Sequence, residues 1–359
     1  MQRRSILLSS GVAAATLMAA HTSAKAQPAI RWRMTSSFPK TLDTLFGTSE
    51  FVCRRVSEMT DGKFQIQLFA PGELVAGNAV LDAVGKGAVD AGHTASNYYT
   101  GKDPSFAFDS VVPFGMNSRQ QSAWMIMGDG KKLMRNLFKE QNIYNVPCGN
   151  IGTQMGGWFR KEIKTVADLK GLKIRLPGLG GDVMAKLGAL PQQIPGSDIY
   201  PALERGTIDA VEWIGPYDDE KLGFNQVAKY YYTPSWWEGG GQCSMYVNLD
   251  KWNELPKEYR AVFEAACAEG QTHMQAMYDT LNPPALRRLI AKGTQVRPFS
   301  NEIMASAYAA AESLYEEISA KNPRFKEIYD NWKAFRNSQI QWLGVAERRF
   351  DNMMATVIR

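Results

Sequence analysis

One short stretch of the sequence, residues 171–177 (GLKIRLP), places a basic side chain where a strand is expected to end. At the two-residue period of a strand, its three apolar residues share one face, and Lys173 and Arg175 share the other. Arginine presents a planar fork of hydrogen-bond donors that matches a carboxylate or a phosphate. The stretch therefore predicts either a solvated edge strand or a fixed guanidinium that binds an anion.

Three more polar side chains lie in apolar or glycine-rich stretches. Gln154 stands among glycines (NIGTQMGG), Glu212 interrupts an apolar strand end (IDAVEWIGP), and Glu238 follows two tryptophans (SWWEGGG). A buried carboxylate costs free energy unless it is paired or bound to a metal. Two interpretations stay open at this point. Arg175 and Glu212 form a structural ion pair, or Arg175 binds a ligand carboxylate while Glu212 and Gln154 supply oxygen ligands to a hard cation.

Residues 1–26 have the pattern of a cleavable signal peptide. Arg3 and Arg4 precede an apolar run at residues 6–20, and residues 24–26 (AKA) form a small-x-small cleavage site before Gln27. The apolar run is shorter than the roughly 20 residues of a membrane-spanning helix. The paired arginines resemble a twin-arginine export signal, with the general secretion route as the alternative. We therefore expect an exported protein of the periplasm.

Charge and cysteine spacing exclude several classes of function. The formal charge of +5 falls to about +2 when the three basic residues of the leader are removed, and no basic tract with interleaved aromatics is present, so we expect no nucleic-acid partner. The spacing of the four cysteines fits neither a CxxC redox motif nor a zinc site. We expect buried free thiols, and Cys148 with Cys243 is the pair to examine for a disulfide.

Residues for catalysis are scarce. Of the three histidines, His21 lies in the leader, which leaves His93 and His273; neither stands in a nucleophile-elbow sequence, and we expect both to be structural. The glycine-rich GLGGDV at residues 178–183 departs from the GxGxxG dinucleotide fingerprint. An exported oxidoreductase is therefore only a remote alternative, and we expect no enzyme.

The elements that must position these side chains follow an α/β rhythm. Residues 30–35 and 63–69 alternate as strands, helices are expected at about 41–59 and 78–86, and an apolar run at 88–92 leads to Asn97 and Tyr98. The rhythm restarts with strands within 144–158, at 172–176 and at 208–213, and with helices at 182–187 and 200–205. Short connections of this kind are typical of parallel sheets covered on both faces. Ligands of such sheets collect at the carboxyl ends of the strands, where Arg175 is expected.

The C-terminal residues, from about 300 to 354, are expected to be helical. Apolar residues recur at spacings of three and four from Phe325 to Phe335, and the pattern continues less regularly to Ala346. A helix unbroken from Pro323 would be about 50 Å long at 1.5 Å per residue, which is longer than one lobe can cover. It is expected either to pack on a second subunit or to form a kinked strap across both lobes.

The chain resembles the extracytoplasmic solute receptors of tripartite ATP-independent periplasmic (TRAP) transporters, of the DctP type. The resemblance covers the whole mature chain and rests on the leader, SSFP at 36–39, YYTGK at 98–102, GLKIRL at 171–176, GTIDAVEW at 206–213 and the terminal helix. Within this family it is closest to the branch that binds 2-oxo acids such as pyruvate. The resemblance implies a two-lobed α/β fold like that of periplasmic binding proteins, with a hinge and a long C-terminal helix.

The resemblance also implies a role for each site residue. Arg175 corresponds to the arginine that binds the substrate carboxylate. Gln154, Glu212 and the backbone carbonyl of Trp213 correspond to ligands of a metal ion, which is sodium in 2-oxo acid receptors and calcium in a lactate-binding relative. The remaining pocket residues near the substrate correspond to Asn97, Tyr98 and Glu238.

The resulting prediction is a receptor without enzymatic activity that closes on a small monocarboxylate and delivers it to the membrane subunits of a TRAP transporter. A 2-oxo acid with sodium is the first expectation, and a 2-hydroxy acid with calcium or another organic acid is the alternative. Residues 27–147 with 245–299 are expected to form lobe I, and 148–244 lobe II. The helical segment 300–359 is expected to mediate a homodimer.

Overall fold

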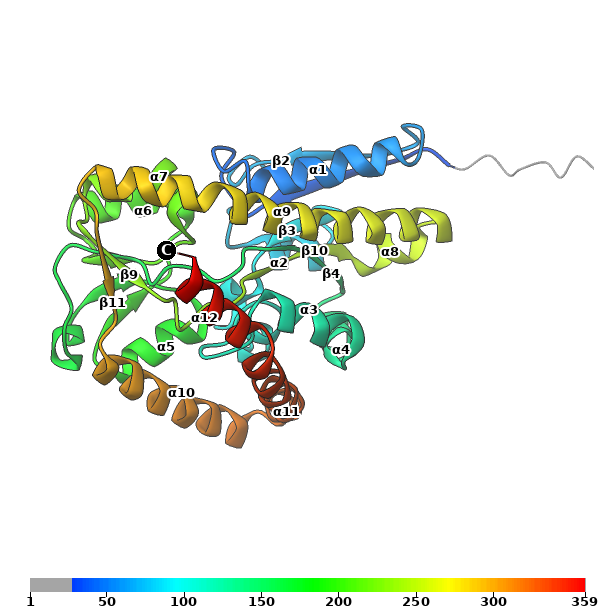
Figure 1. Cartoon of the computed structure of the whole chain (residues 1–359). Coiled ribbons are helices and arrows are strands. Elements are labelled where there is room, and N and C mark those ends of the chain that lie inside the picture. The colour runs from blue at the N-terminus through cyan, green and yellow to red at the C-terminus, as the bar shows by residue number, and fades with distance from the viewer. Residues whose placement is uncertain (1–27, 359) are drawn as a thin grey trace, which may run out of the picture.

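A computed structural model describes residues 28–358 of the chain. Two mixed β-sheets form its centre, and they lie on opposite sides of the molecule in Figure 1. The expected signal peptide, residues 1–26, lies outside the described residues. No helix of residues 28–358 is both long and apolar enough to cross a membrane.

The first sheet has five strands in the order β2-β1-β3-β10-β4. Their bounds are β1 Ile30–Ser36, β2 Phe64–Phe69, β3 Ala91–Thr94, β4 Ile143–Asn150 and β10 Gln242–Asn248. β1 runs parallel to β2 and β3, as the sequence rhythm predicts, but β10 is antiparallel to both of its neighbours. The expectation of a purely parallel sheet is therefore wrong, because β10 enters this sheet from the other half of the molecule.

The second sheet has six strands in the order β11-β9-β5-β8-β6-β7. Their bounds are β5 Trp158–Phe159, β6 Lys173–Arg175, β7 Leu190–Gln192, β8 Ala210–Val211, β9 Tyr230–Thr233 and β11 Gln295–Pro298. β6, β7 and β8 run parallel, and β5 is antiparallel to β8 and β9. β11 pairs with β9, so residues 295–298 join the second sheet although the sequence analysis grouped them with lobe I.

Helices and short 3₁₀ turns cover both sheets. Around the first sheet the elements are α1 Leu45–Glu58, α2 Val80–Gly85, η1 Ser96–Tyr99, η2 Pro104–Asp109, α3 Ser118–Met127, α4 Gly130–Lys139 and α8 Leu249–Glu254. Those that follow strands of the second sheet are η3 Val166–Leu169, α5 Gly178–Lys186, α6 Gly196–Glu204, α7 Pro216–Lys221 and η4 Phe224–Gln226. The chain crosses from one sheet to the other after β4, after β9 and before β11.

A 35-residue helix, α9 (Lys257–Ala291), spans the two halves. It packs against α1 and β4 on one side and against α7 on the other, and Figure 1 shows it running across the upper part of the molecule, below α1. The helix continues through Pro283 and Pro284, although proline removes a backbone donor and is expected to break a helix. It is thus an element shared by both halves.

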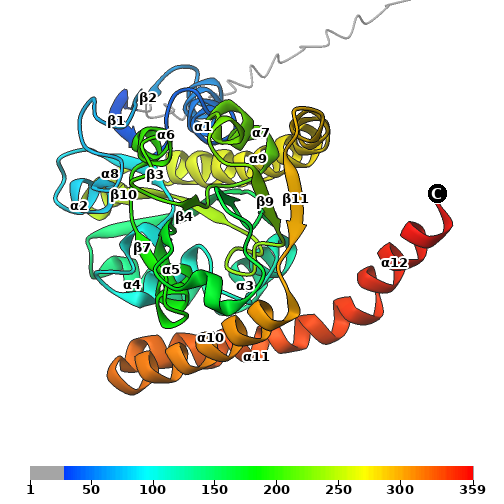
Figure 2. The same cartoon turned by 90° about the vertical axis from the view of Figure 1, so that its left-hand side faces the viewer.

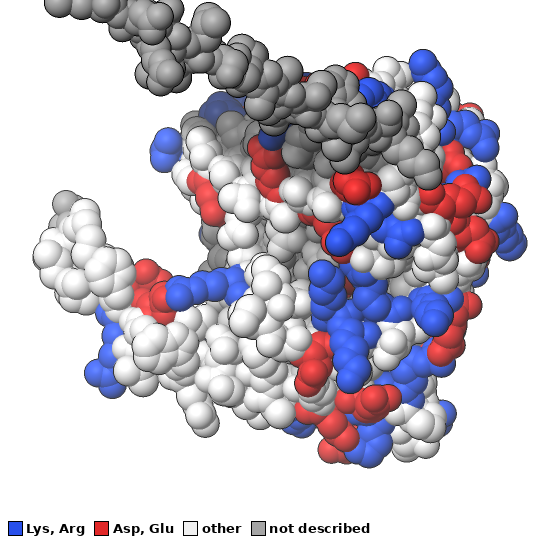
Figure 3. All heavy atoms as spheres, turned by 90° about the vertical axis from the view of Figure 1, so that its right-hand side faces the viewer, with Lys and Arg blue, Asp and Glu red and all other residues white. Residues whose placement is uncertain are grey.

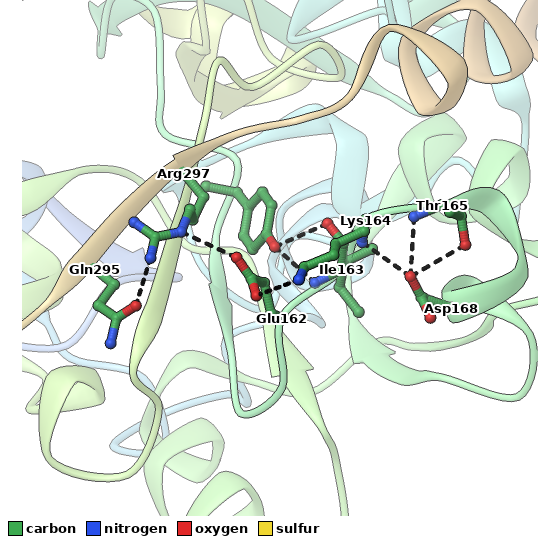
Figure 4. Close-up of polar contacts among 8 residues, drawn as sticks. Glu162, Ile163, Lys164, Thr165, Asp168, Gln295 and Arg297 are labelled. Carbon is green, nitrogen blue, oxygen red and sulfur yellow. Dashed lines mark hydrogen bonds and ion pairs between the residues drawn. The ribbon is translucent and has the colours of Figure 1, made fainter.

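Polar contacts fix the strand β11 and the loop before β6 at the edge of the second sheet. Arg297 of β11 pairs with Glu162 (Nε to Oε1, 3.1 Å), and Lys164 pairs with the same carboxylate at 3.2 Å (Figure 4). Thr165 and Asp168 form a capping box at the start of η3. These contacts tie β11 to the second sheet beyond its pairing with β9.

The C-terminal helices form a strap with a free end. α10 (Asn301–Lys321) packs on α5, and α11 (Pro323–Val345) packs on η2 and α3, so the pair contacts both halves (Figure 2). Helix geometry breaks at Ala346 (φ −93°, ψ −92°), and α12 (Glu347–Val357) buries none of its residues. The predicted single helix is therefore kinked, and Figure 3 shows its last part standing away from the body.

Candidate functional site

Arg175 and Glu212 meet at the carboxyl ends of two neighbouring parallel strands. β6 and β8 pair with Arg175 opposite Val211, and the Glu212 backbone N–H then donates to the Arg175 carbonyl oxygen at 3.0 Å. Both strands are short and end at this point, since glycine and proline follow each of them within a few residues. The two charged side chains are therefore held next to each other by the sheet.

The guanidinium of Arg175 is buried, with 2% of the residue exposed. Nη1 donates to the carbonyl oxygen of Glu212 at 2.6 Å and approaches its carboxylate Oε2 at 3.4 Å. The guanidinium carbon also lies 4.9 Å from the centre of the Trp213 ring. The alternative of a solvated edge strand is therefore wrong, because β6 lies between β8 and β7 and its end, with Arg175, is buried, whereas Lys173 is exposed.

Gln154 and Glu238 come from loops that connect the two sheets. Gln154 follows β4, Glu238 precedes β10, and both side chains are buried. The Gln154 amide Nε2 donates to Glu238 Oε2 at 2.5 Å, and its backbone N–H donates to the Glu238 carbonyl at 3.2 Å. The two crossing loops are thus joined at the site.

Asn97 and Tyr98 reach the site from the first sheet, on η1 directly after β3. Asn97 Nδ2 donates to Oε1 of Glu238, the second oxygen of the carboxylate that Gln154 contacts, at 3.2 Å. The carbonyl of Tyr98 accepts from Gln193 Nε2 at 2.9 Å, which links the first sheet to the loop after β7. The structure therefore brings together all seven residues that the sequence analysis named.

These seven residues line one small cavity with a volume of about 20 Å³, which is enough for about one water molecule. A second cavity of about 180 Å³ lies next to it, and both are lined by Tyr98 and Arg175. Tyr98 is half-buried, whereas the other six are buried. The site is thus nearly closed toward solvent.

Among the residues that line the inner cavity, sequence reasoning missed Ser110, Gly241 and Gln242, besides several apolar residues. The Ser110 hydroxyl donates to the Gln242 carbonyl at 2.9 Å, and Gln242 Nε2 donates to the Asp109 carbonyl at 2.7 Å. The ideal position of a Cβ atom on Gly241 lies 2.8 Å from Gln154 Nε2, so this glycine leaves room for the amide. The three consecutive glycines after Glu238 were the one sequence feature that could have indicated this part of the cavity wall.

Two carboxylates and one guanidinium share this buried space. Burial raises the pKa of Glu238 to about 7, against the opposing effects of Arg175 and the Gln154 hydrogen bond. Burial also raises the pKa of Glu212, and the nearby Glu238 charge adds to the shift while Arg175 opposes it. With a single arginine beside them, the two carboxylates lack a full set of positive partners, which favours a cation in the cavity.

Orphaned oxygen atoms in the cavity lining are available to a cation. Oε1 of Gln154, Oε1 of Glu212 and Oε1 of Gln242 are buried without a hydrogen-bond partner among residues 28–358. Trp213 lines the same cavity, and no backbone N–H of residues 28–358 donates to its carbonyl oxygen. These residues form a set of neutral and anionic oxygen donors, which hard cations such as sodium and calcium prefer. Within the same residues no cluster of three His, Cys, Asp or Glu side chains could hold a metal instead.

The other candidates for chemistry have structural environments. His93 is fully buried, with Nδ1 2.8 Å from the Ser49 hydroxyl and Nε2 2.9 Å from the Cys148 carbonyl oxygen, and burial lowers its pKa to about 4. His273 stacks on Phe51 with ring centres 4.5 Å apart. All four cysteines are free thiols in the structure, so the Cys148–Cys243 pair examined for a disulfide is not bonded.

Residues 35–322 match the DctP model of bacterial extracellular solute-binding proteins, family 7. The chain belongs to the DctP family. Members of this family are transport proteins that bind small organic acids and act with membrane subunits; they are not enzymes, which excludes the oxidoreductase alternative.

Relatives with known ligands resemble the chain along most of its length. It is 48% identical to the monocarboxylate 2-oxoacid-binding periplasmic protein of Nostoc sp., over 99% of this chain and 100% of the relative. A TRAP transporter solute-binding protein of Bordetella bronchiseptica, a dimer with copurified calcium and picolinate, is 52% identical with a TM-score of 0.91, over 92% and 98% of the two chains. A TRAP protein of Pseudoalteromonas atlantica with bound sodium and pyruvate is 34% identical with a TM-score of 0.88, over 90% and 98%.

These matches establish the two-sheet architecture with its long C-terminal helical segment as that of TRAP solute-binding proteins. Among these relatives, the Nostoc protein is named as a receptor for monocarboxylate 2-oxoacids, and the two related structures contain calcium with picolinate and sodium with pyruvate.

Proposed function

We propose that this DctP-family protein binds a chelating monocarboxylate, first of all a 2-oxo acid such as pyruvate, together with one metal cation. The observation that carries the proposal is the pair of orphaned buried oxygens on Gln154 and Glu212 beside the guanidinium of Arg175. The two carboxylates offer oxygen donors to a cation and the arginine offers hydrogen bonds to an anion, so one site has partners for both.

Each residue has a role in this proposal. Arg175 binds the ligand carboxylate through its guanidinium, and Gln154, Glu212 and the Trp213 carbonyl hold the cation. Asn97, Tyr98 and Glu238 complete the wall of the inner cavity. The cation supplies positive charge that offsets the carboxylates and accepts oxygen donors of the ligand. Sodium and calcium both accept such a donor set, and the related structures contain one or the other.

The ligands of the related structures share one chemical feature. Pyruvate carries a carbonyl oxygen, and picolinate a ring nitrogen, one carbon away from the carboxylate. A ligand of this kind offers a cation a second donor atom beside its carboxylate. This favours 2-oxo acids, and it keeps a 2-hydroxy acid such as lactate as the second candidate, since its hydroxyl oxygen has the same position.

We also propose the two-lobe division as the basis of ligand capture. Residues 27–147 with 245–294 form lobe I and residues 148–244 form lobe II, and β11 (Gln295–Pro298), which the sequence analysis grouped with lobe I, joins lobe II by its pairing with β9. Hinge closure stabilises the ligand-bound state through contacts made only when the lobes meet. Contacts such as that of Asn97 with Glu238, which joins the two lobes at 3.2 Å, support this division.

The exposed C-terminal arm supports a homodimer. Trp342, near the end of α11, and Phe350 and Val357, on α12, are 57%, 57% and 70% exposed, and the last part of the chain stands away from the body of the molecule (Figure 3). Apolar side chains in such a patch are typical of a protein–protein interface. We propose that 300–359 mediates this dimer, that residues 1–26 are removed on export, and that the mature protein works in the periplasm with TRAP membrane subunits.

Calorimetric titration of the ligand-free mature protein with pyruvate tests the proposal. The buffer contains sodium, calcium, or neither ion with a chelator present. We expect the wild type to bind pyruvate only when a cation is present. Pyruvate binding by the Glu212→Gln variant should depend less on the cation, because the variant loses the anionic oxygen donor. Cation-independent binding would remove the metal from the proposal, and tighter binding of lactate than of pyruvate would favour the 2-hydroxy acid.

A further inference from the structure

Two adjacent aspartates of the short helix α7, Asp218 and Asp219, are completely buried outside the proposed cavity. Burial raises the pKa of each of them, to about 6 and about 7, against the effect of their hydrogen bonds. Burying two carboxylates side by side is costly, so their contacts are of interest. Those contacts point to two different parts of the molecule.

Asp219 is held by the second sheet. Its Oδ2 accepts hydrogen bonds from the indole Nε1 of Trp158 at 2.9 Å and from the hydroxyl of Tyr231 at 2.7 Å. These two residues are paired between β5 and β9, and their rings stack with centres 4.0 Å apart. The carboxylate of Asp219 is therefore fixed to the rigid part of the sheet.

The other oxygen of Asp219 contacts the segment that carries the proposed cation ligands. Oδ1 accepts a hydrogen bond from the backbone N–H of Ile214 at 3.3 Å. This N–H belongs to the same peptide group as the carbonyl of Trp213. Because a trans peptide group is planar, its N–H and C=O point in opposite directions. An acceptor fixed on the N–H side therefore sets the direction of the Trp213 carbonyl oxygen.

A second contact ties the same segment to Gln154. The carbonyl of Ile214 accepts from the backbone N–H of Met155 at 3.0 Å, and Met155 directly follows Gln154. The hydrogen bond on the Ile214 N–H also polarises the peptide group and makes the Trp213 carbonyl oxygen a better ligand. Asp219 thus acts on the cation ligands without touching the cavity, whose lining it does not join.

We propose that Asp219 is a positioning residue for the cation site, because it orients the peptide group whose oxygen, on Trp213, binds the cation. This inference rests on the proposed function, since it assumes that Trp213 is a cation ligand. Its neighbour Asp218 provides a matched control. Asp218 accepts from the Thr44 hydroxyl at 2.9 Å and from the Tyr278 hydroxyl at 2.7 Å, and so connects α7 to α1 and α9 rather than to the ligand segment.

The test compares Asp219→Asn with Asp218→Asn. Both substitutions replace one oxygen of a buried carboxylate in the same helix by an amide donor. At Asp219 this donor must face an N–H group, whereas the Thr44 and Tyr278 hydroxyls beside Asp218 can turn to accept it. Thermal unfolding is recorded while calcium chloride or sodium chloride is titrated, without organic acid and at saturating pyruvate. We expect Asp219→Asn to raise the half-saturating cation concentration about 10- to 100-fold, the usual effect of removing a partner that orients a metal ligand. Asp218→Asn should raise it less than about twofold.

Tyr231→Phe keeps the proposal testable if Asp219→Asn does not fold. This variant removes one of three donors to Asp219 and leaves the carboxylate in place, so we expect a smaller shift in the same direction. Hydrogen exchange at the Ile214 amide should also become faster in both variants, while it stays unchanged in Asp218→Asn. Equal half-saturating cation concentrations for Asp219→Asn and Asp218→Asn would overturn the positioning role of Asp219. A wild-type protein that responds to no cation would overturn the proposed function itself, and the inference with it.

Discussion

Nη1 of Arg175 lies 2.6 Å from the backbone carbonyl oxygen of Glu212 and 3.4 Å from its carboxylate oxygen Oε2. The guanidinium is thus anchored mainly by the main chain of its neighbour. Within residues 28–358, its other terminal nitrogen, Nη2, makes no hydrogen bond. An ion pair with Glu212 and a binding site for an anion are therefore compatible, because they use different nitrogens of the same side chain.

Replacing Arg175 tests its role in carboxylate binding. We expect Arg175→Ala to weaken pyruvate binding at least about tenfold, because charge-assisted hydrogen bonds contribute roughly 1.5 to 3 kcal/mol each. Lys173→Ala removes an exposed cation from the same strand and should leave the affinity unchanged. Calorimetry measures both. An affinity of Arg175→Ala within about twofold of the wild type would show that the arginine has only the structural role.

The space beside Gly241 tests whether Gln154 must keep its position. A Cβ atom at residue 241 would lie 2.8 Å from Gln154 Nε2, the far end of a flexible side chain, so Gly241→Ala should fold with a displaced amide. We expect a loss of pyruvate affinity on the order of tenfold, because the variant disturbs a hydrogen bond to a charged group. Gly101→Ala, with no atom within 4 Å of the added Cβ, is the control. Unchanged binding by Gly241→Ala would argue against a role of Gln154.

The buried carboxyl of Asp109 predicts a specific dependence of stability on pH. Burial raises its pKa from 3.8 to about 6, while hydrogen bonds from Ser96 and Asn145 oppose the shift. Between these values the folded state keeps a proton that the unfolded state releases. The free energy of unfolding therefore rises as the pH falls from about 6 to about 4, by about 1.4 kcal/mol per pH unit for one proton.

Urea denaturation of wild type and Asp109→Asn across this pH range measures the effect. In Asp109→Asn, the free energy of unfolding should change less steeply with pH, by about 1.4 kcal/mol per pH unit, because one titrating proton is removed. Asp330→Asn, at an exposed ion pair with Lys326, should keep the pH dependence of the wild type. Parallel pH profiles for wild type and Asp109→Asn would show that Asp109 titrates normally.

The exposed arm predicts the effect of a charge at Phe350. Phe350→Glu places a carboxylate in the proposed dimer interface, where its desolvation is unfavourable, so we expect a monomer in size-exclusion chromatography with light scattering. Asn352→Glu adds the same charge at an exposed polar position of α12 and should remain dimeric. Pyruvate binding should be the same in both variants. A wild-type protein that is already monomeric would contradict the dimer.

Local sequence patterns predicted the strands β1 to β4, β6 and β8 and the place of Arg175 at a strand end, but neither the strands β7, β9, β10 and β11 nor the features that depend on the other half of the molecule. The alternation at β6 is present, yet Arg175 is buried because a second lobe covers the strand end. The helix α9 escaped detection because Pro283 and Pro284 interrupt its pattern, although packing against both halves stabilises it. The helix breaks at Ala346 without a proline, so no residue type predicts the break. The role of Gly241 depends on a contact with Gln154, which is distant in the sequence.

The most direct test of the central claim is thermal unfolding of the ligand-free mature protein with pyruvate, lactate, picolinate and a dicarboxylate, each with sodium, calcium or a chelator in sodium-free buffer. Binding to the folded state alone adds about 2.7 kcal/mol to the free energy of unfolding at a hundredfold excess over the dissociation constant. We predict a rise in Tm with pyruvate that requires a cation and is absent in Arg175→Ala. A protein whose Tm responds to none of these acids, or responds equally without a cation, would contradict a cation-dependent 2-oxo acid receptor.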